Sequence, residues 1–471
     1  MILTVSDRTI EFEQGETLLA VLQRAGVPVF APCSGRGSCG KCKVKLNHFT
    51  NPTAAERALL TQAELDDGVR LACQTVLEQD CAAQLVEEPK TMAVTPSKKT
   101  DRSENSTHLR AFCDLGTTTV TVAFVNESNE IVDTVSRVNA QIAYGADVLT
   151  RIGNKEKQPE MTRLIREQLR EMVGCKANEL VVSGNTAMLH LLAGADASAL
   201  GVAPFTPSFT DPIEIDIGSL TVRTLPCLDA FIGADTAAGV LFAEPGDEYK
   251  MLIDLGTNAE IALFDRTRLL AVSAPAGPAF EGANIRCGCA AVEGAISSFR
   301  FENGQRVIET VGLKPPVGLC GSGLLTLIAA LLAHGELTPQ GQLKHGVFDV
   351  FGAVKLYAED VHAFLLAKAA VRTAIDLLLQ KAEVDAAQVS AVLLSGGFGT
   401  FLDPASAAAV GLLPPALARK ATAAGNTSLL GAIAYGAGRR LLPPERTVFN
   451  LSREAGFHDR FLRNCTFETN E

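Results

Sequence analysis

AFCDLGTTTVTVAFV, at residues 111–125, is matched farther along the chain by MLIDLGTNAEIALF, at residues 251–264. In both stretches an apolar run ends in Asp-Leu-Gly-Thr, and a second strand-like run follows. This pattern predicts a β-hairpin whose turn lies at Gly-Thr. Asp114 and Asp254 occupy the same place in the two copies, 140 residues apart. Single hairpins of this kind recur by chance, but two copies favour two related lobes.

The two predicted turns carry residues suited to phosphate and Mg²⁺. A tight Gly-Thr turn presents N–H groups and hydroxyls to phosphate oxygens, and a carboxylate at a strand end holds Mg²⁺, usually through its waters. We therefore predict that both copies contribute to one nucleotide site. The candidate residues are Asp114, Gly116, Thr117 and Thr118 in the first turn, and Asp254, Gly256, Thr257 and Asn258 in the second.

A third glycine-rich element, LLSGGFGTFL at 393–402, follows another apolar run. Its glycines allow a nucleotide base or sugar to approach the backbone closely; they are Gly396, Gly397 and Gly399. The chain has no GxxxxGK[ST] motif, so a P-loop enzyme is not supported. Because ATP hydrolysis needs a polar group to orient water, Asp235 and Asp254 are the candidate catalytic residues. Asp235 could instead cap a helix over residues 236–242.

Cysteines are concentrated near the N-terminus. Cys33, Cys39 and Cys42 stand in PCSGRGSCGKC, and Cys73 follows after thirty intervening residues. This C-x5-C-x2-C…C spacing is one residue longer than the plant-type pattern for a [2Fe-2S] cluster, and we predict that cluster on these four thiolates. The same loop contains three glycines, Gly35, Gly37 and Gly40. They permit positive φ and bring N–H dipoles close to the sulfurs.

Other cysteine assignments stay open at this point. Structural zinc is the main competitor for the N-terminal cysteines, although zinc sites more often use two C-x2-C pairs. Cys81 is an alternative fourth ligand, but it is better interpreted as a small buried side chain. Cys287, Cys289 and Cys320 allow a second metal site, although we favour packing roles for them.

The chain as a whole predicts an α/β multidomain protein. An alternating segment at 2–12 and a helix at 17–25 indicate a small first domain over 1–88. Apolar strands alternate from residue 109 with helical stretches such as 161–173 and 361–379. The expected parts are the first domain at 1–88, a polar linker at 89–108, one lobe at 109–250, a second lobe at 251–440 and a C-terminal extension at 441–471.

Composition excludes several classes of protein. Of 471 residues, 47% are hydrophobic and 20% charged, which is typical of a globular protein. The net charge of -11 argues against binding to nucleic acid, which requires a basic face. The first residues lack an export-signal pattern, and no apolar run is long enough to span a membrane. We therefore expect a soluble cytoplasmic protein that binds no membrane.

The order of these motifs is similar to that of known families. Residues 2–86 resemble [2Fe-2S] ferredoxin domains of the β-grasp fold. Residues 109–440 resemble the duplicated, RNase H-like lobes of the actin-like ASKHA superfamily, in which FIGADTAAG (231–239) and GNTSLLGAIAYGAG (425–438) would be connecting helices with small residues for close packing. The combination resembles the reductive activators of corrinoid-dependent enzymes. Further stretches like that family are GADVLTRI (145–152), SGNTAMLHLLAG (183–194), GPAFEGANI (277–285), LCGSGL (319–324) and LAKAAVRTAI (366–375).

The resemblance implies reduction of cob(II)alamin to cob(I)alamin, driven by hydrolysis of MgATP, with electrons passed through the [2Fe-2S] cluster. The partners would be a corrinoid protein or corrinoid-dependent methyltransferase and an external low-potential electron donor. One alternative is an activator resembling those of 2-hydroxyacyl-CoA dehydratases. Two others are a small-molecule kinase with an appended redox domain and a nucleotide-gated interaction module without turnover.

Overall fold

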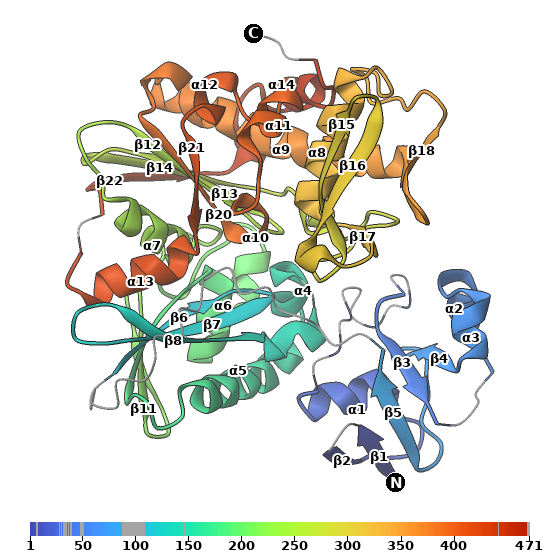
Figure 1. Cartoon of the computed structure of the whole chain (residues 1–471). Coiled ribbons are helices and arrows are strands. Elements are labelled where there is room, and N and C mark those ends of the chain that lie inside the picture. The colour runs from blue at the N-terminus through green and yellow to red at the C-terminus, as the bar shows by residue number, and fades with distance from the viewer. Residues whose placement is uncertain are drawn as a thin grey trace. The chain divides into compact units, whose positions relative to one another are not determined.

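The structure of the chain is a computed structural model, and it describes residues 1–5, 8–27, 29, 31, 35, 37, 40–47, 51–86, 109–145, 147–440 and 442–468 (Figure 1). These residues fall into two compact units. The first unit comprises residues 1–86 and 109–225, and the second comprises residues 226–468. The predicted linker at 89–108 lies outside the described residues.

The described residues between 1 and 86 form a five-stranded sheet with three short helices. The strands are β1 (Ile2–Val5), β2 (Arg8–Glu11), β3 (Lys43–Leu46), β4 (Val69–Leu71) and β5 (Cys81–Leu85), in the sheet order β2-β1-β5-β3-β4. The helices are α1 (Leu18–Arg24), α2 (Ala54–Leu59) and α3 (Gln62–Asp66). The predicted helix at 17–25 is confirmed, because Thr17 caps α1 by accepting a hydrogen bond from the N–H of Ala20.

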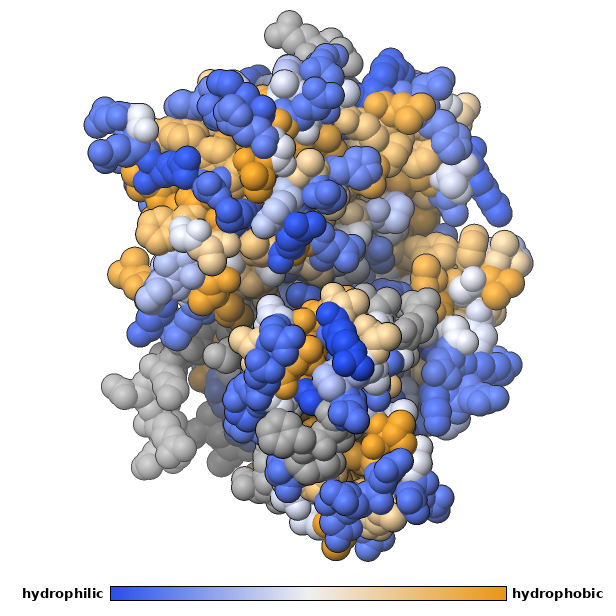
Figure 2. All heavy atoms as spheres, turned by 90° about the vertical axis from the view of Figure 1, so that its right-hand side faces the viewer, coloured by the Kyte–Doolittle hydropathy of each residue, from blue (hydrophilic) through white to orange (hydrophobic). Residues whose placement is uncertain are grey.

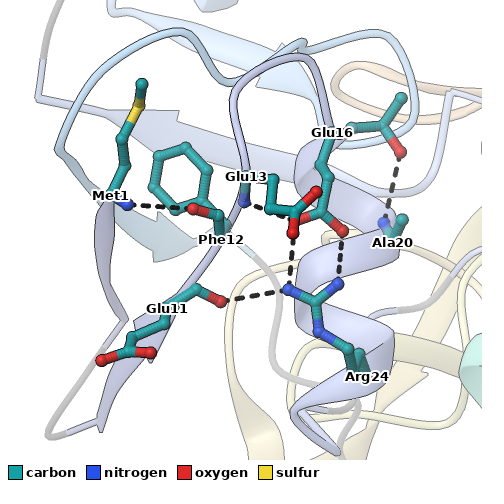
Figure 3. A network of polar contacts seen from close by, with 8 residues as sticks. Met1, Glu11, Phe12, Glu13, Glu16, Ala20 and Arg24 are labelled. Atoms are coloured by element: carbon teal, nitrogen blue, oxygen red, sulfur yellow. Dashed lines mark hydrogen bonds and ion pairs between the residues drawn. The ribbon is translucent and has the colours of Figure 1, made fainter.

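A polar network ties α1 to the end of the β1–β2 hairpin (Figure 3). The Arg24 guanidinium pairs with the Glu16 carboxylate and donates to the carbonyl of Glu11 over 3.0 Å. The backbone N–H of Glu13 donates to Glu16 Oε2 over 2.7 Å. The hydrogen bond from Arg24 lowers the pKa of Glu16, so this carboxylate stays charged at neutral pH.

The rest of the first unit is built on a six-stranded sheet in the order β10-β11-β9-β6-β7-β8. Its strands are β6 (Arg110–Leu115), β7 (Thr119–Val125), β8 (Ile131–Val138), β9 (Glu179–Gly184), β10 (Glu214–Ile217) and β11 (Leu220–Thr224). The helices are α4 (Val148–Gly153), α5 (Gln158–Val173) and α6 (Thr186–Ala193). β6 and β7 pair antiparallel around the Gly116–Thr118 turn, which confirms the first predicted hairpin.

The second unit contains another six-stranded sheet, in the order β21-β20-β12-β13-β14-β22. Its strands are β12 (Lys250–Leu255), β13 (Ala259–Phe264), β14 (Arg268–Ala274), β20 (Ala391–Ser395), β21 (Ala421–Gly425) and β22 (Glu445–Phe449). In both sheets an antiparallel meander of three strands is followed by two strands parallel to the first of them. This shared topology confirms that the repeated Asp-Leu-Gly-Thr motif marks a duplicated fold.

Both faces of the second sheet are buried. Met251 and Ile253 belong to a large core shared with α8 (Gly321–Ala333) and α9 (Ala358–Ala382), whereas Leu252 packs on the other face with Val240 of α7 (Ala234–Ala243). Burial on both faces explains why β12 and β13 read as nearly continuous apolar runs. Smaller strands and helices complete the unit: β15 (Ala295–Glu302), β16 (Gln305–Thr310), β17 (Gly318–Leu319), β18 (Val347–Phe351), β19 (Val354–Tyr357), α10 (Gly396–Gly399), α11 (Pro404–Ala409), α12 (Pro415–Ala418) and α14 (Phe457–Asn464).

Two helices of small residues pack closely on one side of this sheet, as we predicted for 231–239 and 425–438 (Figure 1). They are α7 and α13 (Thr427–Gly436). A Cβ at Gly431 would lie 1.9 Å from the carbonyl oxygen of Ala238, so only glycine fits at this contact. The compact units divide after Leu225, and α7 packs on β12, β13 and α13. The lobe boundary after residue 250 stays a prediction.

This close approach makes Gly431 a sensitive position. We expect Gly431→Ala to lower the free energy of unfolding of the second unit by about 1–3 kcal/mol, the usual cost of overpacking a well-packed contact. Thermal unfolding followed by circular dichroism measures the change. Gly246→Ala is the matched control, because an added Cβ there meets no atom within 4 Å. Equal melting temperatures for the two variants would contradict the packing argument.

In the described residues no helix combines the length and apolar character that a membrane span requires. On the face drawn in Figure 2, hydrophilic and hydrophobic residues are interspersed among the described atoms.

Candidate nucleotide and cluster sites

Asp254 lies at the end of β12, next to residues from three other elements. In the sheet it is the partner of Ser395 on one side and of Glu260 on the other. Ser395 Oγ lies 3.0 Å from Asp254 Oδ2 and 2.8 Å from the hydroxyl of Thr427, the first residue of α13. The serine therefore connects the Asp254 carboxylate to the start of α13.

Gly396 is packed against the same carboxylate. Its φ is +83°, and a Cβ at this position would lie 2.5 Å from Asp254 Oδ1 and 2.5 Å from the carbonyl oxygen of Leu255. Only glycine fits this position, because both the backbone conformation and the neighbouring atoms exclude a side chain. At the other two predicted glycines a Cβ would meet no close contact. An added Cβ at Gly397 has no atom within 4 Å, and one at Gly399 would lie at ordinary van der Waals distance from neighbouring strands.

Glu260 is a residue of this site that our sequence analysis missed. Burial first, and then the neighbouring carboxylates of Asp235 and Asp254, hold the pKa of Glu260 well above its ordinary value. At the equivalent place in the first hairpin, the partner of Asp114 is Thr121. The signal in the sequence was an acidic residue within the apolar run AEIALF.

Asp235 lies in the first turn of α7, close enough to Glu260 for their charges to interact. The N-cap of α7 is Gly233, and no side chain caps this helix. The Asp235 carboxylate accepts a hydrogen bond of 2.7 Å from the N–H of Thr236. The structure thus brings Asp235 and Asp254 into one acidic cluster with Glu260.

The turn of the second hairpin, at Gly256–Asn258, is linked to another missed acid, Glu281. The Thr257 hydroxyl donates a hydrogen bond of 3.0 Å to Glu281 Oε2. The pKa of Glu281 is raised above its ordinary value, because the effect of desolvation is larger than the lowering by this hydrogen bond. Glu281 stands in GPAFEGANI, a stretch that carried the family resemblance but to which sequence reasoning gave no role.

The turn of the first hairpin, at Gly116–Thr118, lies in the first unit, where three described side chains of that unit contact it. The Asn139 amide donates to the carbonyl of Gly116 over 2.8 Å, and the Arg151 guanidinium donates to the carbonyl of Thr117 over 2.6 Å. The Asn185 amide donates to the Thr117 hydroxyl over 2.9 Å. Sequence analysis missed all three residues, although Arg151 and Asn185 stand in GADVLTRI and SGNTAMLHLLAG. Asp114 itself is half-buried at the end of β6, beside Ser183 of β9.

Two of the four predicted cluster ligands lie in the described residues, and they are neighbours. The backbone N–H of Ala72 donates to the carbonyl of Cys42, which holds the turn of Cys73 beside the loop of Cys42. A hydrogen bond between the two thiols is the main cause that lowers the pKa of Cys73 to about 6. Cys33 and Cys39 lie outside the described residues.

The backbone around these thiols fits a cluster. Gly35, Gly37 and Gly40 have φ values of +84°, +71° and +65°, which confirms the predicted positive φ. A Cβ at Gly35 would lie 3.9 Å from the Cβ of Cys73, so this loop approaches the thiol closely. Paired thiols, one with a depressed pKa, beside a loop of left-handed glycines are a donor set suited to iron and sulfide.

Of the other cysteines weighed in the sequence analysis, Cys81 and Cys320 are buried, whereas Cys287 and Cys289 are half-buried. Cys81 begins β5, is 6% exposed and belongs to the core of the small domain, where burial raises its pKa. The backbone of Cys287 and Cys289 pairs with that of Leu319. Cys320 is buried, with its thiol 3.2 Å from the carbonyl of Ile296. Among the described residues no group of three or more histidines, cysteines or acids is arranged to hold a metal ion.

The fold and these two sites define a ferredoxin domain joined to an actin-like ASKHA domain, and comparison with known families agrees. The family model of the 2Fe-2S iron-sulfur cluster binding domain matches residues 3–78. The model described as the RACo middle region matches 111–245, and that of the C-terminal domain of RACo, the ASKHA domain, matches 248–471. The chain therefore belongs to the RACo family.

Two curated proteins and one solved structure are similar to this chain. The corrinoid activation enzyme RamQ of Eubacterium limosum is 28% identical over 415 residues, which cover 76% of this chain and 70% of that protein. The [Co(II) methylated amine-specific corrinoid protein] reductase of Methanosarcina barkeri is 29% identical over 232 residues, covering 43% of this chain and 42% of that protein. A solved structure of a reductive activator for corrinoid, iron-sulfur protein covers 99% of this chain and 98% of its own, with a TM-score of 0.68 and 24% identity, and shows the same fold.

Proposed function

We propose that this chain reduces the Co(II) form of a corrinoid carried by a partner protein to Co(I), and that hydrolysis of MgATP drives the reaction. The observation that carries the proposal is the presence, in one chain, of a ferredoxin domain and both Asp-Leu-Gly-Thr hairpins of an ASKHA domain. The names of the two curated relatives support it, because one activates corrinoids and the other reduces a Co(II) corrinoid protein. A cytoplasmic location stays a prediction from the sequence.

The two domains have separate tasks in this proposal. Cys33, Cys39, Cys42 and Cys73 would hold the [2Fe-2S] cluster, which supplies one-electron transfer when bound. The hairpin turns would bind the ATP phosphates, with Asp114 and Asp254 available to Mg²⁺ and its waters. Asp235 and Asp254 are the proposed residues that orient the hydrolytic water. Gly396, Gly397 and Gly399 would admit the nucleoside to the backbone.

The energetics explain why a ferredoxin domain is combined with an ATPase. Plant-type ferredoxins have potentials near roughly -400 mV, and we expect the corrinoid couple to lie lower, so the electron moves uphill. A conformational preference of ~10⁴-fold, about 5.5 kcal/mol, is within the range of ligand-driven transitions. At ~59 mV for each tenfold change, that preference offsets roughly 240 mV. A conformational change driven by ATP could therefore supply enough free energy to move the electron to a corrinoid couple of lower potential.

An anaerobic assay tests the function. The purified protein is mixed with ATP, a low-potential reductant and a corrinoid protein loaded with cob(II)alamin, and the cob(I)alamin absorption band is followed. We expect the band to grow only when ATP and the cluster-loaded protein are both present. Equal growth with a non-hydrolysable ATP analogue would reject the proposed coupling.

A further inference from the structure

Arg151 of α4 is one of the largest fully buried side chains of the chain, with 0% of the residue exposed. Its Nη2 donates to the carbonyl of Thr117 over 2.6 Å, and its Nε donates to the carbonyl of Gly145 over 2.8 Å. Its Nη1 lies 3.3 Å from the sulfur of Met188. The guanidinium thus contacts the backbone of the Gly116–Thr118 turn.

Among the described residues, the three hydrogen-bond partners of this guanidinium are electrically neutral, and the acid whose charge acts on it is Asp147. The acid nearest in sequence, Asp147, uses its Oδ1 for the N–H of Thr150 over 2.8 Å and its Oδ2 for the Thr150 hydroxyl over 2.6 Å. Burial lowers the pKa of Arg151 to about 9, so the group is still a cation at neutral pH. A buried charge is costly to the protein unless a counter-charge offsets it. The Asp147 carboxylate offsets part of that cost, and an anion bound nearby would offset more of it.

The backbone carbonyls of the Gly116–Thr118 turn are engaged by donors of the first unit. The carbonyls of Gly116, Thr117 and Thr118 accept hydrogen bonds from the Asn139 amide, the Arg151 guanidinium and the Asn139 N–H, respectively. These hydrogen bonds partly neutralise the negative charge of the three carbonyl oxygens. The carbonyl oxygens would therefore repel a phosphate bound at the turn less strongly. The hydrogen bond from Arg151 to the Thr117 carbonyl places the cation next to the backbone of a residue that carries one of the turn's hydroxyls.

We propose that Arg151 is a positioning residue whose buried positive charge selectively stabilises the phosphate chain of ATP at the Gly116–Thr118 turn. This inference rests on the proposed function, because it assigns ATP phosphates to that turn. A residue that only holds the turn in shape would affect every nucleotide equally. A charge acting on phosphates affects ATP most, ADP less and AMP least.

The test compares nucleotide affinities of the full-length, cluster-loaded protein by isothermal titration calorimetry. Arg151→Gln removes the charge but keeps a donor, and Arg151→Lys keeps the charge but loses the planar fork. We expect Arg151→Gln to weaken ATP binding on the order of 10- to 100-fold and AMP binding by less than about threefold, as a Coulomb interaction over several ångström predicts. Arg151→Lys should preserve the graded preference for ATP. The matched control is Arg137→Gln, which removes an exposed arginine that pairs with Glu171 on the same unit.

Equal weakening of ATP, ADP and AMP binding in Arg151→Gln would overturn the inference in favour of a structural role. Unchanged ATP affinity would also overturn it. If Arg151→Gln does not fold, the Arg151→Lys variant decides the question. This variant keeps the positive charge, so loss of its graded preference for ATP over ADP and AMP would contradict the inference. Wild-type protein that binds no ATP would reject the proposed function itself, whereas normal ATP binding by both wild type and Arg151→Gln rejects only the role of Arg151.

Discussion

Replacing Asp254 with alanine is expected to abolish ATP-dependent formation of cob(I)alamin and to leave the visible spectrum of the [2Fe-2S] cluster unchanged. The carboxylate lies against Gly396 and Ser395 at the end of β12, where the second hairpin would bind MgATP. Loss of a preorganised charged group at a reacting centre typically lowers turnover by about 10²- to 10³-fold. The predicted cluster ligands Cys42 and Cys73 belong to the first unit and Asp254 belongs to the second, so the substitution removes no predicted ligand.

The variant should fold normally, which makes its loss of activity interpretable. Asp254 is one of the two carboxylates that raise the pKa of Glu260, so its removal relieves repulsion within the acidic cluster. We therefore expect an unchanged or slightly raised melting temperature. Asp247→Ala is the matched control, because Asp247 is an exposed acid of the same unit that pairs with Arg266. Undiminished corrinoid reduction by Asp254→Ala would refute the assigned site.

Local patterns in the sequence were sufficient to predict the features that depend on residues close together along the chain. The Asp-Leu-Gly-Thr hairpins, the helix at 17–25 and the left-handed glycines of the cysteine loop are each determined within about ten residues. Close packing of α7 on α13 was also predictable, because glycine and alanine are the residues that allow such an approach. All of these predictions are confirmed.

Residues that act through the register of the sheet could not be predicted in the same way. Glu260 meets Asp254 only because β12 and β13 pair in one register, and Glu281 reaches Thr257 across 24 residues of chain. Arg151 is an ordinary helical arginine in the sequence, and its burial against the Thr117 carbonyl depends on how α4 packs. A charged residue can therefore stand within a sequence stretch that resembles a family, while the stretch does not show what the residue contacts.

The cluster prediction is tested most directly by Cys73→Ser. We expect the variant to lose the cluster, so that iron and sulfide fall from about two of each per chain to near zero and the visible absorption disappears. Serine removes the thiolate at the position where Cys42 and Cys73 lie together. Iron and sulfide analysis with an absorption spectrum measures the outcome. Zinc in the wild-type protein, in place of iron and sulfide, would contradict the redox assignment.

Cys81→Ser is the matched control for this variant, since the two cysteines are eight residues apart. Cys81 is buried in β5 within the apolar core, so its replacement should cost stability but keep the cluster. The two variants together decide which cysteine is the fourth ligand. Cys73→Ser should also retain ATP hydrolysis, because the hairpin turns are intact, and yet form no cob(I)alamin. Hydrolysis without reduction in this variant would show that ATP powers the transfer but that electrons require the thiolates of the first domain.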